Sequence, residues 1–221
     1  MRRIGKRNKD IDWKYILTEL LLIVVGILLA INLNSWSANR RLDQQVEQSI
    51  LRVKEEIKLN MEELEDVLEV NKPTQDFYLE ISSLTDEEVK TLECSVDKMQ
   101  SFRKKYPEEF NVNDSTKVKK GVFKYEIDIQ FSLEYTEVRD MAWRTAQLSN
   151  NISEYNYDCL QSLLTAYDLQ EIFVNVQERF LDMTIVRDRG VYVSTYLLCY
   201  DLGEKLLERY KEIMEEIGDC D

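Results

Sequence analysis

The chain has 221 residues, with 29 basic and 42 acidic side chains, a formal net charge of −13, six glycines and two prolines. This length suffices for one anchor and one domain that buries its own core, and the scarcity of Gly and Pro disfavours sandwiches and barrels. Histidine is absent, which excludes Ser-His and Cys-His catalysis and removes the commonest ligand of zinc and copper.

Residues 1–14 form a basic tail, and the rest of the chain is strongly acidic. Residues 37–221 hold 23 basic and 39 acidic side chains, a net charge of −16. A domain with this charge repels phosphate backbones, so nucleic acid is not an expected partner. The basic side chains before the apolar segment are Arg2, Arg3, Lys6, Arg7, Lys9 and Lys14.

Residues 15–36 are predicted to form a transmembrane helix. No charged residue occurs between Leu20 and Ala38, and a bilayer core needs about 20 mainly apolar residues. Trp13 and Tyr15 flank one end and Trp36 the other, as interfacial anchors do. The expected environment is therefore a lipid bilayer, with a single pass through it.

A cleaved signal peptide is the alternative interpretation of this segment. Its apolar core would be shorter and would end in small residues of the A-x-A type, whereas Asn32, Asn34 and Trp36 follow here. The positive-inside rule predicts a cytoplasmic N-terminus, because six basic residues precede the span and only Arg40 and Arg41 closely follow it. In a bacterium this orientation places the protein in the inner membrane with its large domain in the periplasm.

One face of the span has the composition of a helix-association seam. Gly26 and Ala30 form a small-x-x-x-small pair that allows close approach of two backbones in lipid. Glu19 is costly against lipid and less so against a partner helix; the alternative is a lone helix whose Glu19 reaches the headgroups. The seam predicts a homo-oligomer or a membrane protein partner, and its residues are Glu19, Ile23, Gly26, Ala30, Leu33 and Asn34.

Residues 37–72 are predicted to continue the anchor as a long juxtamembrane helix. Asn71, Lys72 and Pro73 are expected to end it. An apolar stripe at spacings of three and four indicates a packing face within the chain or, alternatively, a coiled coil with a second copy. The stripe consists of Leu42, Val46, Ile50, Val53, Ile57, Met61, Leu64 and Leu68.

Residues 73–221 are predicted to form an acidic helical extramembrane domain. A short helix or turn is expected over residues 77–84, and a capping box at 85–88 predicts a helix to Tyr106, where Pro107 stops it. Residues 108–121 have a loop-like composition. Alternating apolar and polar residues between Phe123 and Leu133 predict an extended segment.

The remaining residues have helical periodicity. Helices are expected over 138–148, 154–186 and 192–217, with a turn at 187–190. The predicted fold class is mainly α: a single N-terminal transmembrane helix continues into a helical bundle, with at most a minor extended or β segment near 122–133. The expected buried side of the last helix is Leu197, Tyr200, Leu206, Leu207, Tyr210, Ile213 and Ile217.

The four cysteines, Cys94, Cys159, Cys199 and Cys220, include no C-x-x-C pair. A zinc site or thioredoxin-like motif is therefore not expected. The cysteines are interpreted as small buried apolar residues, or as including one disulfide if the domain lies outside the cytoplasm. No cofactor and no metal is predicted.

Two stretches resemble an uncharacterised family of small membrane proteins common in Bacteroidota. Thr18–Arg40 matches its opening, with Ser35 and Ser37 departing from the usual Asn or acidic residues, and Ala142–Gln170 is similar to its middle. The resemblance implies a single-pass protein with a helical extramembrane domain of unknown function and no activity to carry over. The matching positions of the opening are Glu19, Gly26, Ile27, Leu28, Ala30, Asn34 and Trp36.

These features together favour a non-enzymatic, membrane-anchored interaction or scaffold protein. The alternative is a subunit of a channel, transport or signalling assembly that uses Glu19 within the membrane. An enzyme that works by carboxylates alone is a third hypothesis. Glu126 and Asp128 form one such pair, although 42 acidic residues produce many pairs by chance.

Overall fold

The computed structural model describes residues 13–85, 89–130, 132–183 and 189–217. The chain divides into two compact units, residues 1–47 and 48–221, and each is described by itself. The long helix α1 (Trp13–Ser82) begins in the first unit and continues in the second. The described residues are mostly helical with one small antiparallel sheet, so the prediction of a mainly α chain is confirmed.

The first unit is described as residues 13–47 of α1, and the apolar side chains of residues 16–36 are exposed. An 18-residue window has a mean hydropathy of 2.6, and none of it is buried. Among the described residues, α1 is the one helix with a segment long and apolar enough to cross a bilayer. Residues 1–12, which hold most of the predicted basic tail, lie outside the described part.

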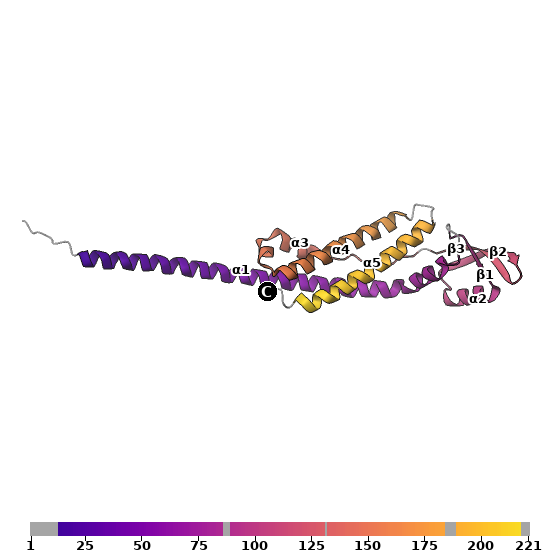
Figure 1. Cartoon of the computed structure of the whole chain (residues 1–221), viewed down its shortest axis with the longest axis horizontal. Coiled ribbons are helices and arrows are strands. Elements are labelled where there is room, and N and C mark those ends of the chain that lie inside the picture. The colour runs from indigo at the N-terminus through magenta and orange to yellow at the C-terminus, as the bar shows by residue number, and fades with distance from the viewer. Residues whose placement is uncertain (1–12, 86–88, 131, 184–188, 218–221) are drawn as a thin grey trace, which may run out of the picture. The chain divides into compact units, whose positions relative to one another are not determined.

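In the second unit the remainder of α1 packs beside α4 (Tyr157–Met183) and α5 (Arg189–Glu216) (Figure 1). From Ile50 to Leu68 the predicted apolar stripe faces this core, which confirms this part of it as an internal packing face, although Met61 is only half-buried. On α5 the expected buried side is also confirmed, with Leu197 and Leu207 half-buried. The buried stripe residues of this unit are Ile50, Val53, Ile57, Leu64 and Leu68.

The expected end of the first long helix at Pro73 is wrong. The helix α1 includes Pro73 and runs on to Ser82. An interior proline removes one backbone hydrogen bond and costs about 3 kcal/mol. The next turns bury Phe77, Tyr78 and Ile81 almost completely, and burial of three large apolar side chains at about 1.5–3 kcal/mol each outweighs that cost.

Three antiparallel strands form a sheet in the order β1-β3-β2, from β1 (Thr91–Cys94), β2 (Phe110–Lys119) and β3 (Val122–Ile129). The period-two segment is β3, so this part of the prediction is confirmed. The limit to one minor β segment near 122–133 is wrong, because β3 is the central strand of three. Gly121, with φ of 79°, allows the tight turn between β2 and β3.

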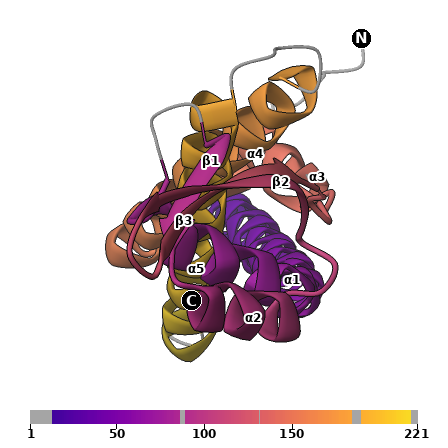
Figure 2. The ribbon, with the colours of Figure 1, turned by 90° about the vertical axis from the view of Figure 1, so that its right-hand side faces the viewer.

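One face of the sheet packs on α2 (Val96–Lys105) and on the end of α1 (Figure 2). Phe77 of α1 stacks on Phe110 of β2 with ring centroids 5.4 Å apart. The predicted helix from Thr85 is wrong: Thr85 bridges to Leu92 of β1, and α2 begins only after Ser95, whose side chain accepts from the Lys98 backbone. Residues 86–88 of the expected capping box lie outside the described residues.

Residues 132–140 form an extended segment, here called the strap, that is held by side-chain amides instead of a neighbouring strand. Asn71 of α1 donates to the carbonyl oxygen of Glu134 at 2.7 Å and accepts from its N–H at 3.0 Å. From α4, Gln170 and Gln177 donate to the carbonyl oxygens of Arg139 and Thr136 at 3.0 and 3.1 Å. The strap thereby satisfies its buried backbone groups without joining a sheet.

The spacing of the amides matches the repeat of an extended chain. Asn60 of α1 pairs with Arg139 as Asn71 pairs with Glu134. Eleven helical residues rise about 16.5 Å and five extended residues span about 16.5 Å, so both pairs fit one straight strap. The expectation of a helix from Val138 is therefore wrong at its start.

The short helix α3 (Met141–Leu148) begins where the strap ends, and a carboxylate from α1 caps it. Glu56, which is 7% exposed, accepts from the backbone N–H groups of Ala142 at 2.7 Å and Trp143 at 3.2 Å. Its carboxylate also accepts from the Tyr167 hydroxyl at 2.8 Å. Burial, with the nearby Glu56 carboxylate, raises the pKa of Tyr167, which keeps this donor protonated. A 3-10 helix, Asn150–Glu154, then leads to α4.

Candidate functional site: a groove between α1 and α5

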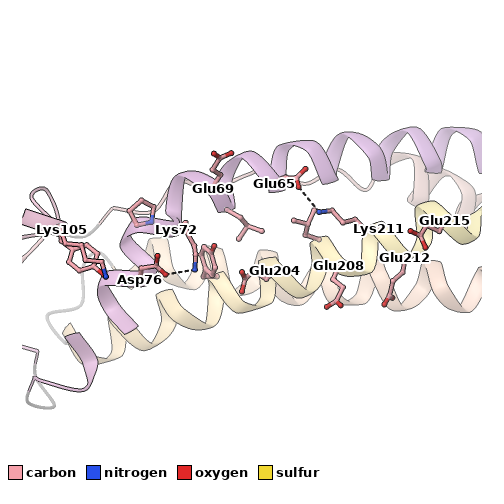
Figure 3. Close-up of a pocket in the computed structure, with 15 residues that line it drawn as sticks. Glu65, Glu69, Lys72, Asp76, Lys105, Glu204, Glu208, Lys211, Glu212 and Glu215 are labelled. Carbon is pink, nitrogen blue, oxygen red and sulfur yellow. Dashed lines mark hydrogen bonds and ion pairs between the residues drawn. The ribbon is translucent and has the colours of Figure 1, made fainter. Parts of the chain in front are cut away.

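A groove of about 840 Å³ runs between α1 and α5 in the second unit (Figure 3). Residues 65–76 of α1 form one side and residues 200–215 of α5 form the other, while Lys105 and Tyr106 lie at one end. This volume is within the range of ligand-binding pockets, about 300–1,000 Å³.

Acidic side chains dominate both rims of the groove. Glu204, Glu208, Glu212 and Glu215 follow one another along α5 at spacings of four, four and three, and therefore share one side of that helix. The α1 rim contributes three more carboxylates, while three lysines line the groove in all, which leaves a net charge of −4. The α1 carboxylates are Glu65, Glu69 and Asp76.

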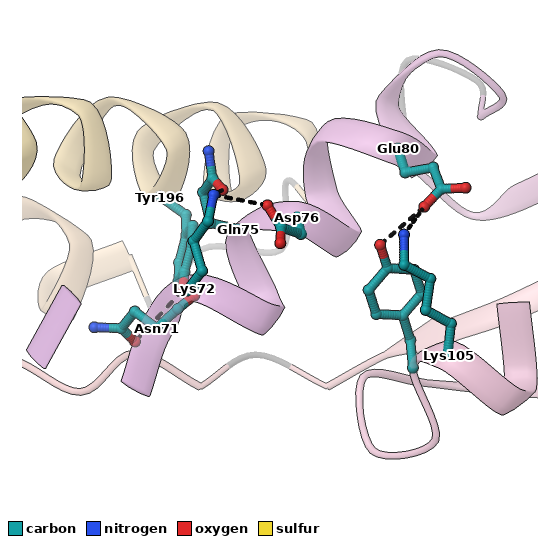
Figure 4. A network of polar contacts seen from close by, with 8 residues as sticks. Asn71, Lys72, Gln75, Asp76, Glu80, Lys105 and Tyr196 are labelled. Carbon is teal, nitrogen blue, oxygen red and sulfur yellow. Dashed lines mark hydrogen bonds and ion pairs between the residues drawn. The ribbon is translucent and has the colours of Figure 1, made fainter. Parts of the chain in front are cut away.

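The lysines of the groove are already engaged by neighbouring groups (Figure 4). Lys72 donates to Asp76 at 2.8 Å and to Gln75 at 2.9 Å, and the bond to Asp76 raises the pKa of Lys72. Lys105 donates to Glu80 at 2.8 Å. This bond, with a second one from Tyr106, lowers the pKa of the Glu80 carboxyl.

The third lysine, Lys211, reaches across the groove to Glu65 at 3.1 Å (Figure 3). Both side chains are at least half exposed, at 50% and 58%, so this pair contributes little to stability and can open. Glu212 pairs with Arg209 at 2.7 Å. Within the described part of the chain, four rim carboxylates have no ion-pair partner: Glu69, Glu204, Glu208 and Glu215.

The floor between the rims is apolar. Leu68, Tyr200 and the half-buried Leu207 line it. Gly203 brings the helices close together here, because a Cβ at this position would lie 3.1 Å from Leu68 Cδ2 and 3.3 Å from Phe173 Cε2. The groove therefore combines an apolar floor with two negatively charged edges.

A second cavity of about 440 Å³ lies beside α3 and α4. Trp143 and Tyr167 stack there with ring centroids 5.0 Å apart and planes inclined by 5°. Its walls carry Arg144 as well as carboxylates, so its charge is more balanced than that of the groove. No group of three or more His, Cys, Asp or Glu side chains that could hold a metal occurs among the residues described.

The cysteines differ in state. Cys94 and Cys199 are free and buried, whereas Cys159, at the start of α4, is disulfide-bonded. Burial raises the pKa of the Cys199 thiol to about 12. Cys220 lies outside the described residues.

The residues predicted as sites from the sequence lie elsewhere, in the first unit. All six residues of the proposed seam are exposed on α1, and apart from the adjacent backbone of α1 itself no atom of the described residues lies within 4 Å of a Cβ placed on Gly26. Trp13 and Trp36 are 73% and 60% exposed, and the Arg40 guanidinium lies 5.5 Å from the Trp36 ring centroid. The Tyr15 side chain is outside the described part.

The groove itself was not predicted from the sequence. In the sequence, the one indication of the groove is the row of glutamates beside the apolar face of the last helix. Such a row is also the ordinary pattern of a solvent-exposed helix surface. What the periodicity could not supply is the pairing of α5 with residues 65–76 of α1. Comparisons with family models, curated proteins and solved structures find no match to this chain.

Proposed function

We propose that the chain is a membrane-anchored, non-enzymatic interaction protein. Residues 15–36 cross the bacterial inner membrane once, and the helical unit recruits a protein partner through its acidic groove. The resemblance of Thr18–Arg40 to the Bacteroidota membrane family agrees with this assignment.

The observation that carries the proposal is the uncovered apolar segment of α1. Its 18-residue window has a mean hydropathy of 2.6 with none of it buried. Exposure of that much contiguous apolar surface to water is costly, and soluble proteins rarely show such patches. A bilayer provides the missing apolar cover.

Two features support a periplasmic location of the helical unit. Six basic residues precede the apolar segment, which favours a cytoplasmic N-terminus. Cys159 is disulfide-bonded, and disulfides persist in oxidising compartments such as the periplasm.

Binding accounts for the groove better than catalysis does. The chain has no histidine, and the described residues that line the groove include no Ser, Cys or Thr that could act as a nucleophile. Its carboxylates form two exposed rows instead of one enclosed pair, so they provide a charged surface.

The test has two parts, in the host bacterium. After alkaline carbonate extraction the full chain should stay with the membranes, and a periplasm-dependent reporter fused after Asp221 should be active while a cytoplasm-dependent reporter is not. Chemical cross-linking of intact cells should then capture a protein partner. The proposal would be contradicted if carbonate released the chain from the membranes, or if only the cytoplasmic reporter were active. A chain that cross-links to no protein would also contradict it.

A further inference from the structure

We infer that the occupant of the groove is a basic, amphipathic helix of the partner protein, with positive residues on both sides of an apolar stripe. This inference rests on the proposed function, since it assigns the chemistry of the partner that the anchored unit recruits. Three properties of the groove support it: its charge, its floor and its length.

The charge of both rims is available for a cation. Four carboxylates on the two rims have no ion-pair partner among the described residues, and three of them, Glu204, Glu208 and Glu215, follow one side of α5. Rows of charge at spacings of three and four match Lys or Arg side chains at the same spacings on a helix packed alongside. Opening of the exposed Glu65–Lys211 pair would free a fifth carboxylate.

The floor requires more than positive charge from the occupant. Leu68, Tyr200 and Leu207 lie between the charged rims, so a fully hydrated polycation would leave this apolar surface uncovered. An amphipathic helix covers such a floor with its apolar stripe, which is the general mode of helix-in-groove recognition.

The length of the groove suits a helix of a few turns. The α5 side extends from Tyr200 to Glu215, which corresponds to about 22 Å, or four helical turns. A second copy of this chain does not fit, because residues 37–221 carry a net charge of −16 and would repel the acidic rims.

The test uses the full chain in nanodiscs of phosphatidylcholine and a fluorescent 14-residue Leu/Lys peptide with lysines on both sides of a leucine stripe. Binding to empty nanodiscs is subtracted. The groove variant combines Glu69→Gln, Glu204→Gln and Glu208→Gln. The matched control combines Glu55→Gln, Glu126→Gln and Glu178→Gln, which removes the same charge from exposed positions outside the groove.

The peptide should bind the wild-type chain and the control variant with similar affinity and the groove variant about tenfold more weakly, since three exposed ion pairs are lost. A scrambled peptide of the same composition should bind poorly, and spermine should not compete at equal charge concentration. The inference would be overturned if both variants lost peptide affinity equally, or if the scrambled peptide bound as well as the designed one. Competition by spermine, or a change in the oligomer mass of the groove variant, would also overturn it.

Both triple variants replace exposed side chains, so their circular dichroism spectra and thermal midpoints should match the wild type. Failure of the groove assignment can be distinguished from failure of the proposed function. If the chain stays anchored and cross-links its partner equally in the wild type and the groove variant, the groove assignment fails while the interaction function stands.

Discussion

The side chain of Asn60 pairs with both backbone polar groups of Arg139, a residue 79 positions away in the sequence. Its amide nitrogen donates to the Arg139 carbonyl oxygen at 2.7 Å, and its amide oxygen accepts from the Arg139 N–H at 2.8 Å. The Asn60 side chain is fully buried, with 0% exposure. A single side chain thus takes the place of a neighbouring strand at the end of the strap.

Replacement of Asn60 by alanine should destabilise the second unit by about 1–3 kcal/mol, because the part-buried N–H of Arg139 loses its partner and the Arg139 carbonyl keeps only Gln170. The measurement is urea denaturation of the full chain in detergent, followed by far-ultraviolet circular dichroism. Asn113→Ala, on the exposed part of β2, should stay within about 0.5 kcal/mol of the wild type. Similar urea midpoints for Asn60→Ala and Asn113→Ala would show that the contacts of Asn60 with Arg139 do not stabilise the unit.

Glu56 provides a second test of buried polar contacts. Glu56→Gln should cost about 1–3 kcal/mol, because one of its two oxygens becomes a donor that faces donors from Ala142, Trp143 or Tyr167. Tyr167→Phe should cost about 1 kcal/mol, and the two effects should not add, since both changes break one network. Glu55→Gln, at the exposed neighbouring position, is the control; additive costs would show that the two residues act independently.

Much of the helical content could be predicted, because a stripe such as Ile50 to Leu68 has a period that depends only on which face is buried. The strands could not be predicted as well. The residues of β2 beyond Val112 are all exposed and, except for Val118, polar, so that strand has no alternation that the sequence could reveal. Its pairing with β3 stabilises it instead.

The strap and the groove depend on tertiary partners for the same reason. Nothing local to residues 132–140 indicates that amides from α1 and α4 will replace helical hydrogen bonds, and Val138 and Thr136 also suit a helix start. Likewise, Glu69 and Glu204 belong to different helices, which pack closely together at Gly203. The sequence indicates which face of each helix is apolar, whereas the groove depends on which helices pack against each other.

Thiol labelling should distinguish the free cysteines from the disulfide-bonded one. In the folded chain Cys94 and Cys199 should resist labelling at pH 8, because both are buried and burial raises the pKa of each thiol, that of Cys199 to about 12. Unfolding without reductant should make the thiols of Cys94 and Cys199 reactive, whereas Cys159 should become reactive only after reduction. Non-reducing peptide mapping should recover Cys159 in a disulfide-linked peptide; labelling of Cys159 before reduction would contradict the disulfide.

The proposed seam in the first unit can be tested in the membrane. Replacement of Gly26 and Ala30 by isoleucine should weaken self-association or partner association, because small residues at this spacing allow close helix contact. The matched change of Val25 and Leu29 to isoleucine alters the neighbouring positions and should have little effect. A membrane two-hybrid reporter compares the two pairs, and equal signals from both would leave the seam without a role.

The strap also determines the order in which the second unit can assemble. Asn60 and Asn71 lie on a helix that is synthesised early, but their backbone partners are 79 and 63 residues further along the chain. Until those partners arrive, the inner face of α1 carries polar groups that only water can satisfy, and α4 has the same need through Gln170 and Gln177. Helix docking without the strap would trap unpaired amides, so the unit is expected to fold in one cooperative and comparatively slow step after residue 177 has been made.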